Sequence, residues 1–269
     1  MELRFSPLFS GSSGNATYVG CDDAHILVDA GMSGNRITGE LLHMGIDPRC
    51  LNAILVTHEH ADHIKGIGIL SRKYDLPIYA TEGTWQGMYN KIGNVSDKNR
   101  IIFVPEQDFF IGSIDITPFS TPHDANQSVG YTFELNGAKL AIATDLGCIK
   151  ESWLKYVTGS DAVILESNYD PDMLRAGPYP YELKKRITSR KGHLSNDDAG
   201  HVAAELVRNG TSQIILGHLS KENNFPELAM RTCELNLLMA GIEPHVDASL
   251  YVAKRDGATG MFSISCEMV

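Results

Sequence analysis

The stretch Thr57-His58-Glu59-His60-Ala61-Asp62-His63 decides both the expected fold and the expected chemistry of this chain. It follows the apolar run 52–56, which is typical of a buried strand, and it places three imidazoles and two carboxylates within six residues. Imidazole nitrogen and carboxylate oxygen are ligands that suit Zn²⁺, Mn²⁺ and Fe²⁺. The first two histidines, two residues apart on the loop, can face one ion, and the final Asp-His pair opens a helix and can face a second. The alternative is a solvated polar turn, because short motifs also occur by chance.

Three more apolar runs end at a candidate ligand. The run 139–144 leads to Asp145, the run 212–217 leads to His218, and the strand expected near 114–119 is followed by His123. Sites in α/β proteins gather at the carboxyl ends of strands, so we expect these side chains to converge. Taken singly, each histidine fits a structural role and Asp145 fits a turn before Gly147.

This pattern resembles the metallo-β-lactamase superfamily, whose hallmark is His-x-His-x-Asp-His after a strand. The earlier segment 27–31, Leu-Val-Asp-Ala-Gly, resembles the superfamily motif in which an Asp buttresses the ligand loop. The resemblance extends over nearly the whole chain and implies two divalent ions, Zn, Mn or Fe. It implies one ion held by His58, His60 and His123, another held by Asp62, His63 and His218, and Asp145 as the bridge between them.

A pair of ions about 3.5–4 Å apart lowers the pKa of a shared water from about 15.7 toward 7, so hydrolysis is the expected reaction. We count Asp62 among the catalytic residues as well as among the expected ligands.

A second segment, Gly192-His193-Leu194-Ser195, precedes an expected helix, a strand and then His218. This order is similar to that of ribonuclease Z, where the corresponding loop histidine protonates the leaving oxygen. A phosphodiester needs such a donor because an alkoxide is a poor leaving group. We assign that role to His193, with Glu166 as a partner that orients it. The alternative is a residue beside a helix cap with no chemistry.

The branch of the superfamily follows from what the chain has and lacks. Cys148 lies three residues too late for the Cys ligand of the best-known β-lactamases, and thioesterases and lactonases usually have a shorter gap than the 72 residues, 146–217, before the last His. The chain also lacks the large extra domain of ribonuclease-J-like nucleases. It looks most like the compact bacterial YycJ/WalJ-like branch, on segments 9–15 and 218–224. Members of that branch are regarded as DNA exonucleases that act from the 5′ end.

Possible substrate contacts lie near His193. The run 184–191 holds five basic residues and no acid, in a chain of net charge −10, and it either grips backbone phosphates or is a solvated face. Tyr179 and Tyr181 either stack on unpaired bases or pack on the core. The loop 10–15 either holds a terminal phosphate or is a tight turn. The candidate substrate-binding residues are Lys184, Lys185, Arg186, Arg190, Lys191, Ser13 and Asn15.

The rest of the sequence predicts an α/β protein with four layers, αβ/βα, in which two mixed β-sheets pack face to face with helices outside. One domain, 1–269, is expected because no linker or low-complexity tract is present. Strands are expected near 3–9, 15–20, 25–29, 52–57, 76–80, 101–104, 114–119, 128–134, 138–144, 161–166, 212–217 and 243–247, with more near the C-terminus. Helices are expected over 35–44, 61–74, 82–91, 149–157, 195–208 and 224–240.

Composition limits the setting. Five scattered cysteines without a CxxC pair argue against disulfides, and no signal peptide or apolar run of about 18 residues is present, so a cytoplasmic location is expected.

The expected function is a dinuclear metal-dependent phosphodiesterase, a DNA exonuclease working 5′ to 3′ on nucleic acid. The alternatives are a small-molecule hydrolase at the same site (a cyclic phosphodiesterase, lactonase or thioesterase), an RNA nuclease, or a metal-stabilised scaffold without turnover. The oligomeric state is left open.

Overall fold

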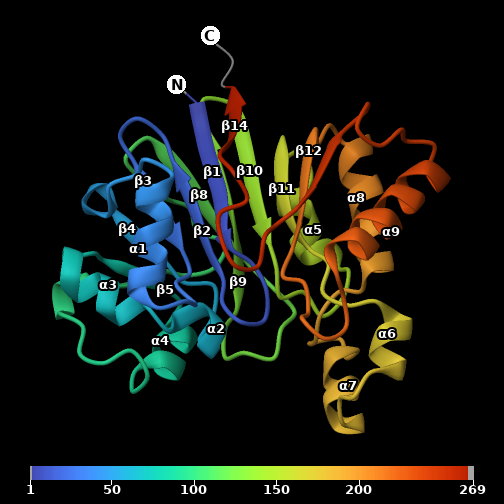
Figure 1. The fold of residues 1–269 in the computed structure, drawn as a ribbon. Helices are drawn as coiled ribbons and strands as arrows, with labels where there is room; N and C mark the ends of the chain where they lie inside the picture. Colours follow the sequence, from blue (N-terminus) through green and yellow to red (C-terminus); the bar gives the residue numbers. More distant parts are fainter. Residues whose placement is uncertain (1, 266–269) are drawn as a thin grey trace.

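The computed structural model describes residues 2–265, which build two β-sheets of seven strands each (Figure 1). In the first sheet, neighbouring strands from β14 through β1 and β2 to β3 pair antiparallel, and those from β3 through β4 and β5 to β6 pair parallel. Its strand order is β14 (Phe262–Ser265), β1 (Glu2–Phe9), β2 (Ala16–Gly20), β3 (His25–Val28), β4 (Ala53–Leu55), β5 (Ile78–Ala80) and β6 (Arg100–Ile102).

The second sheet repeats this design. It is antiparallel between β7 and β10 and parallel from β10 to β13. Its strand order is β13 (Ser249–Val252), β12 (Gln213–Gly217), β11 (Ala162–Glu166), β10 (Ala138–Ala143), β9 (Val129–Leu135), β8 (Ile114–Ser120) and β7 (Phe109–Ile111).

Both faces of the parallel strands are buried, which explains their continuous apolar runs. In β12, Ile215 points into the core between the sheets, while Ile214 and Leu216 pack against the outer helices. In β3, Leu27 lies in the outer core of the first sheet, whereas its neighbour Val28 lies in the core between the sheets. Each such side chain contributes about 1.5–3 kcal/mol when it is fully buried.

Helices cover the outer face of each sheet, so the predicted four-layer αβ/βα sandwich is confirmed (Figure 1). The first sheet carries α1 (Gly34–His43), α2 (Ala61–Ile64), α3 (Ile67–Tyr74) and α4 (Glu82–Met88). The second carries α5 (Glu151–Val157), α8 (Asn196–Arg208) and α9 (Pro226–Met239). Two short helices, α6 (Pro171–Ala176) and α7 (Tyr181–Ile187), project together beyond one end of the sheets. Short 3₁₀ turns cover Pro48–Cys50 and Asp97–Asn99. No helix within residues 2–265 is long and apolar enough to cross a bilayer.

Two expected elements differ from the structure. The strand expected at 243–247 is wrong: the strand is β13, and the preceding residues form a turn in which Glu243 N donates to the carboxylate of Asp247 at 2.7 Å. The left-handed backbone of His245, with φ of 64°, is incompatible with a strand. The helix expected over 61–74 breaks between α2 and α3. At that break Gly66 N donates to Ala30 O at 2.7 Å, and a Cβ there would lie 2.5 Å from a backbone oxygen.

Three elements were not expected. The strand β7 is only three residues long and pairs with β8 through a tight turn. Helices α6 and α7 have six and seven residues, fewer than two turns each, so they carry too little apolar periodicity to be recognised.

Candidate metal centre

Three candidate site residues lie where their strands end, and all three have left-handed backbone. Asp29 follows β3 with φ of 58°, Asp145 follows β10 with φ of 58°, and His218 follows β12 with φ of 56°. A non-glycine residue rarely adopts this conformation, and such residues cluster at functional sites. The left-handed conformation turns the backbone sharply away from the sheet at each of these residues. The side chain of each residue therefore lies at the end of its strand.

The histidines expected to hold the first ion come together. The ligand atoms of His58, His60 and His123 all lie within 4.8 Å of one another. His60 Nδ1 and His123 Nε2 are 3.3 Å apart, and the ring of His58 lies edge-on to both other rings. The two residues of the His-x-His step therefore face one point, as their spacing predicts.

The second expected group also converges. The ligand atoms of Asp62, His63 and His218 lie within 4.8 Å of one another. Asp62 Oδ2 is 3.6 Å from His63 Nε2 and 3.7 Å from His218 Nε2.

Asp145 lies between the two groups. Its Oδ1 is 3.5 Å from His123 Nε2, and its Oδ2 is 3.4 Å from His63 Nε2. One carboxylate thus presents an oxygen to each group. The structure brings all seven expected ligands to one end of the sandwich.

Several buried ligand atoms of the site make no hydrogen bond and are suited to bind divalent cations. Of the buried side-chain atoms within residues 2–265 that make no hydrogen bond, three belong to the expected ligands: His58 Nε2, His218 Nε2 and Asp145 Oδ2. An unsatisfied buried polar atom costs about 1–3 kcal/mol, and here the three belong to residues of the ligand cluster. Imidazole nitrogens and carboxylate oxygens in two groups match the donor set of a pair of Zn²⁺, Mn²⁺ or Fe²⁺ ions.

A second layer of polar contacts fixes the rings. His63 Nδ1 lies 2.7 Å from Asp29 Oδ2, His123 Nδ1 lies 3.1 Å from the carbonyl oxygen of Gly192, and His218 Nδ1 lies 2.9 Å from Glu166 Oε1. Pairing one ring nitrogen outside the cluster sets the tautomer that leaves the other nitrogen as a ligand. Asp29 also accepts hydrogen bonds from the backbone N–H and the hydroxyl of Thr57, which fits the expected role of buttressing the ligand loop.

The pKa shifts of the site residues show that the site stabilises positive charge. Burial, together with the neighbouring His63, holds the pKa of His58 well below its usual range, so this ligand is neutral. Burial opposes ionisation of Asp62, but His63 and His218 lower its pKa to about 2. Burial likewise opposes protonation of His63, yet Asp29 and Asp145 raise its pKa to about 9. The buried carboxylates therefore stabilise a cation at this point.

His193 lies beside the cluster and is held by Glu166. Its Nδ1 is 2.7 Å from Glu166 Oε1 and 3.7 Å from Asp145 Oδ1, and its side chain is 19% exposed. In the part of the chain that the structure describes, His193 Nε2 makes no hydrogen bond. The loop before it is fixed, because His193 N donates to Ile187 O at 3.0 Å.

Glu166 connects the proposed donor to a proposed ligand. The side chain is fully buried, and Oε1 lies within hydrogen-bond distance of both His193 and His218. Its other oxygen accepts from Leu146 N at 2.6 Å and from Leu194 N at 3.3 Å. One carboxylate thus fixes two imidazoles at once, a double role that the sequence did not indicate for it.

The basic residues of the run 184–191 do not all lie on the same side of the structure, and only one of them lines the cleft. Arg186 lines a cleft of about 210 Å³ over the ligands and pairs with Asp124, whose Oδ1 is 3.4 Å from His123 Nε2. Lys184 instead donates to the carbonyl oxygens of Arg175 and Gly177, at 2.7 and 2.8 Å, so it holds the local fold together. Three further basic residues are exposed and do not line this cleft: Lys185, Arg190 and Lys191.

The loop 10–15 lies against the ligands. Asn15 Nδ2 is 3.0 Å from His63 Nε2 and 3.3 Å from Asp62 Oδ2, so it contacts the ligands themselves, where a phosphate-holding role was expected. Ser13 is exposed and does not line the cleft, whereas Ser12 does.

Sequence reasoning missed two residues that line the cleft, Asp124 and Asn168. Asp124 carried a signal, as it directly follows an expected ligand. In the loop 10–15, which was already a candidate from the sequence, the hydroxyl of Ser10 accepts from His218 N at 2.8 Å, and Ser12 lines the cleft.

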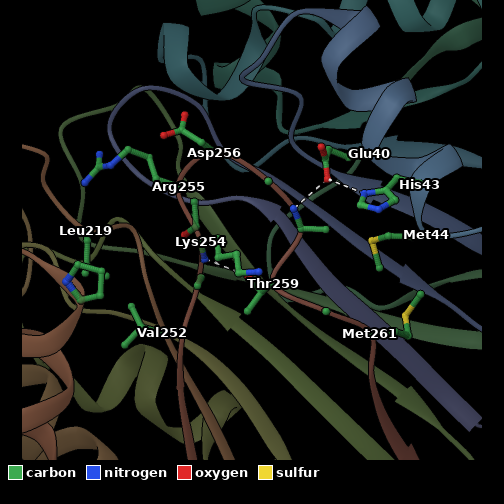
Figure 2. A pocket seen from close by; sticks show the side chains of 16 residues that line it. Glu40, His43, Met44, Leu219, Val252, Lys254, Arg255, Asp256, Thr259 and Met261 are labelled. Atoms are coloured by element: carbon green, nitrogen blue, oxygen red, sulfur yellow. Dashed lines mark hydrogen bonds and ion pairs between the residues drawn. The ribbon is translucent and has the colours of Figure 1, made fainter.

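A larger cavity of about 870 Å³ lies elsewhere (Figure 2). It is formed between residues 252–261 and α1, where Glu40 accepts a hydrogen bond from Ala258 N at 3.0 Å. Ser10 and Leu219, which lie near the candidate site, line this larger cavity, but none of the seven expected ligands does. The smaller cleft is therefore the candidate reaction site, because the expected ligands lie at it and not at the larger cavity.

Comparison with known proteins agrees with this geometry. A family model described as a beta-lactamase superfamily domain matches residues 24–219. The exodeoxyribonuclease YycJ of Bacillus anthracis is 44% identical over 229 residues, covering 85% of this chain and 87% of that protein. The exodeoxyribonuclease WalJ of Streptococcus pneumoniae serotype 2 is 41% identical over 264 residues, covering 97% and 98%. The solved structure of the metallo-β-lactamase fold protein YhfI from Bacillus subtilis gives a TM-score of 0.74 at 18% identity, covering 98% of this chain and 100% of that chain. The family expected from the sequence is thus confirmed, and the chain belongs to the beta-lactamase superfamily with the metallo-β-lactamase fold.

Proposed function

We propose that this protein is a metal-dependent phosphodiesterase that degrades DNA from an end, as an exodeoxyribonuclease working 5′ to 3′. The convergence of seven ligands beside the His193–Glu166 pair carries this proposal. The curated relatives named exodeoxyribonucleases, at 41% and 44% identity, support DNA as the substrate.

Two bound ions would supply an activated water and neutralise charge on the phosphate. Asp145 and the six other expected ligands would hold these ions beside the cleft, where the ions would bind the oxygens of the reacting phosphate. Arg186, on the cleft wall, is placed to pair with a phosphate oxygen, although it now pairs with Asp124. We propose that substrate phosphate competes with Asp124 for this guanidinium.

His193 is the proposed proton donor to the leaving oxygen. With Nδ1 fixed by Glu166, its Nε2 is the nitrogen left to face a substrate. The ring lines the cleft together with Asp145 and His218, so a phosphodiester bound over the ligands lies beside it. Proton transfer from a positioned histidine contributes about 10²–10⁴-fold to such reactions.

A small-molecule phosphodiesterase is the second candidate, and the volume of the cleft favours it. A cleft of about 210 Å³ holds only the reacting group and its immediate neighbours. The exposed Lys185, Arg190 and Lys191 next to the cleft favour the first candidate, because a polyanion extends beyond the cleft and a small ester does not.

The test uses purified protein with Mn²⁺ and oligonucleotides of DNA and RNA, single- and double-stranded, labelled at either end. We expect stepwise shortening of DNA from the 5′ end, abolished by Asp145→Ala and retained by Glu205→Ala, an exposed acidic residue on α8. Turnover of small esters without any shortening of DNA contradicts the proposal, and shortening of RNA alone reassigns the substrate.

Two further expectations stay predictions. Residues 1–269 form one domain, which is supported by the core shared between the two sheets, and limited proteolysis checks it. A cytoplasmic location is checked by cell fractionation.

A further inference from the structure

A second groove of about 610 Å³ lies next to the cleft over the expected ligands and is lined by residues of α6, of α7 and of the segments beside them. Figure 1 shows these two helices projecting beyond one end of the sheets. Tyr179 lines both the groove and the cleft, so the two cavities share a wall. We call it the tyrosine groove. It is lined by Tyr169, Pro171, Leu174, Arg175, Tyr179, Tyr181, Lys184, Lys185 and Thr188.

The tyrosine groove is preformed by its own small core. Tyr169, Leu174 and Ile187 are buried against one another, and Tyr179 packs on them. Lys184 Nζ ties α7 to the end of α6 through two carbonyl oxygens. A site that is held in shape before binding loses less conformational entropy when its ligand arrives.

The lining has the chemistry of a nucleotide site. It offers three aromatic rings and three basic side chains, and no acidic residue among residues 2–265 lines it, in a chain of net charge −10. Arg175 pairs with Asp172, but that pair is largely exposed and weak. Lys185 makes no ion pair with any residue in the described range 2–265. Tyr181 is 74% exposed, which leaves its ring free to stack.

Resting on the proposed function, we propose that the tyrosine groove binds the unpaired nucleotides of single-stranded DNA that adjoin the scissile phosphate. Because Tyr179 lines both cavities, a strand whose phosphate lies in the cleft can continue into the groove. Aromatic rings stack on any base, so the groove binds without sequence preference. Stacking needs an open base face, and inside a duplex both faces of each base are covered by neighbouring base pairs. The groove therefore makes the enzyme select an end with several unpaired nucleotides, either single-stranded or frayed.

The test measures KM for single-stranded (dT)₁₂ with Mn²⁺ in Tyr181→Ala. We expect KM to rise at least about fivefold, since loss of one base–aromatic stack weakens binding by that much or more. Tyr181→Phe keeps the ring and should stay within about twofold of the original protein. The matched control is Tyr89→Ala, which removes a tyrosine that is 66% exposed on the other half of the molecule and lines neither cavity. Lys185→Gln should lower the dependence of log KM on log salt by about 0.7.

Equal KM values for Tyr181→Ala and the original protein, while DNA is still shortened, overturn the tyrosine groove and leave the proposed function standing. A Tyr181→Phe variant as impaired as the alanine variant also overturns it, because the ring is then not what binds. If KM responds only for (rU)₁₂, the ligand is RNA and the proposal for DNA is wrong. If the original protein hydrolyses bis(p-nitrophenyl) phosphate but never shortens (dT)₁₂, the proposed function fails and the groove proposal fails with it.

Discussion

Replacing His193 with alanine separates proton donation from metal binding. The His193 side chain is 19% exposed and makes one hydrogen bond, to Glu166 Oε1. The same oxygen also contacts His218 Nδ1, at 2.9 Å. Glu166 therefore keeps three partners after the substitution: His218, Leu146 N and Leu194 N. We expect the ligand cluster to stay intact and both ions to remain bound.

The size of the effect depends on the leaving group. An oligonucleotide releases an alkoxide, which needs a proton, so His193→Ala should lower kcat on DNA by about 10²–10⁴-fold. At 1.36 kcal/mol for each factor of ten, this corresponds to about 2.7–5.4 kcal/mol of lost transition-state stabilisation. A p-nitrophenyl ester releases a weakly basic phenolate that leaves unaided, so the loss there should be about tenfold or less.

The assay compares kcat on (dT)₁₂ with kcat on thymidine 5′-(p-nitrophenyl phosphate), alongside metal content after dialysis. The control is His43→Ala, a histidine 83% exposed on α1. Equal losses on both substrates contradict proton donation by His193. Loss of an ion shows that His193 is a ligand, which its grouping with Asp145, Glu166 and His218 permits.

Four other perturbations test the architecture. Asp29→Asn removes the carboxylate that is 2.7 Å from His63 Nδ1, so metal affinity should fall about 10–100-fold, measured by metal content at limiting Mn²⁺; unchanged occupancy contradicts the buttress role. Gly31→Ala places a Cβ 1.6 Å from Asp62 O and should lower the free energy of unfolding by several kcal/mol in urea titrations. Gly39→Ala, in the exposed part of α1 with nothing within 4 Å, should raise it by about 0.5–1 kcal/mol; similar effects at both glycines would refute the steric argument. Removing the ions with a chelator should lower Tm, because ligand at 100 times Kd contributes about 2.7 kcal/mol, and an unchanged Tm means that the folded cluster holds no ion.

The ligand cluster was predictable because each member is marked locally. A run of buried apolar residues ending at Asp145 or His218 shows where a strand stops and where its next side chain must lie. Parallel pairing then brings these strand ends together. Leu165 is the register partner of both Ala143 and Leu216, so the ends of β10, β11 and β12 lie side by side. Strand-end position is a local property, and the sequence displays it.

The substrate-binding residues were less predictable, because their roles depend on helix phase and on distant partners. Lys184 and Arg186 are two residues apart in one charge run, but successive helical residues are rotated by about 100°, so the two point to different sides of α7. One fixes α6 and the other reaches the cleft. Asn15 likewise became a neighbour of His63 only through a contact 48 residues away in the chain.

Several features of the candidate metal centre lower the stability of the folded chain, and bound ions would offset part of that loss. Asp29, Asp145 and His218 hold left-handed backbone that costs about 1–2 kcal/mol per residue, and three buried donor atoms of the cluster lack partners. A sheet end selected for stability alone would place glycine at those turns and apolar side chains behind them. Since the expected ligands come from both sheets, bound ions and packing of the two sheets would stabilise each other. We therefore expect the protein without metal to be less stable, with the strained residues and the expected ligands held in a geometry that is already fixed before substrate binds.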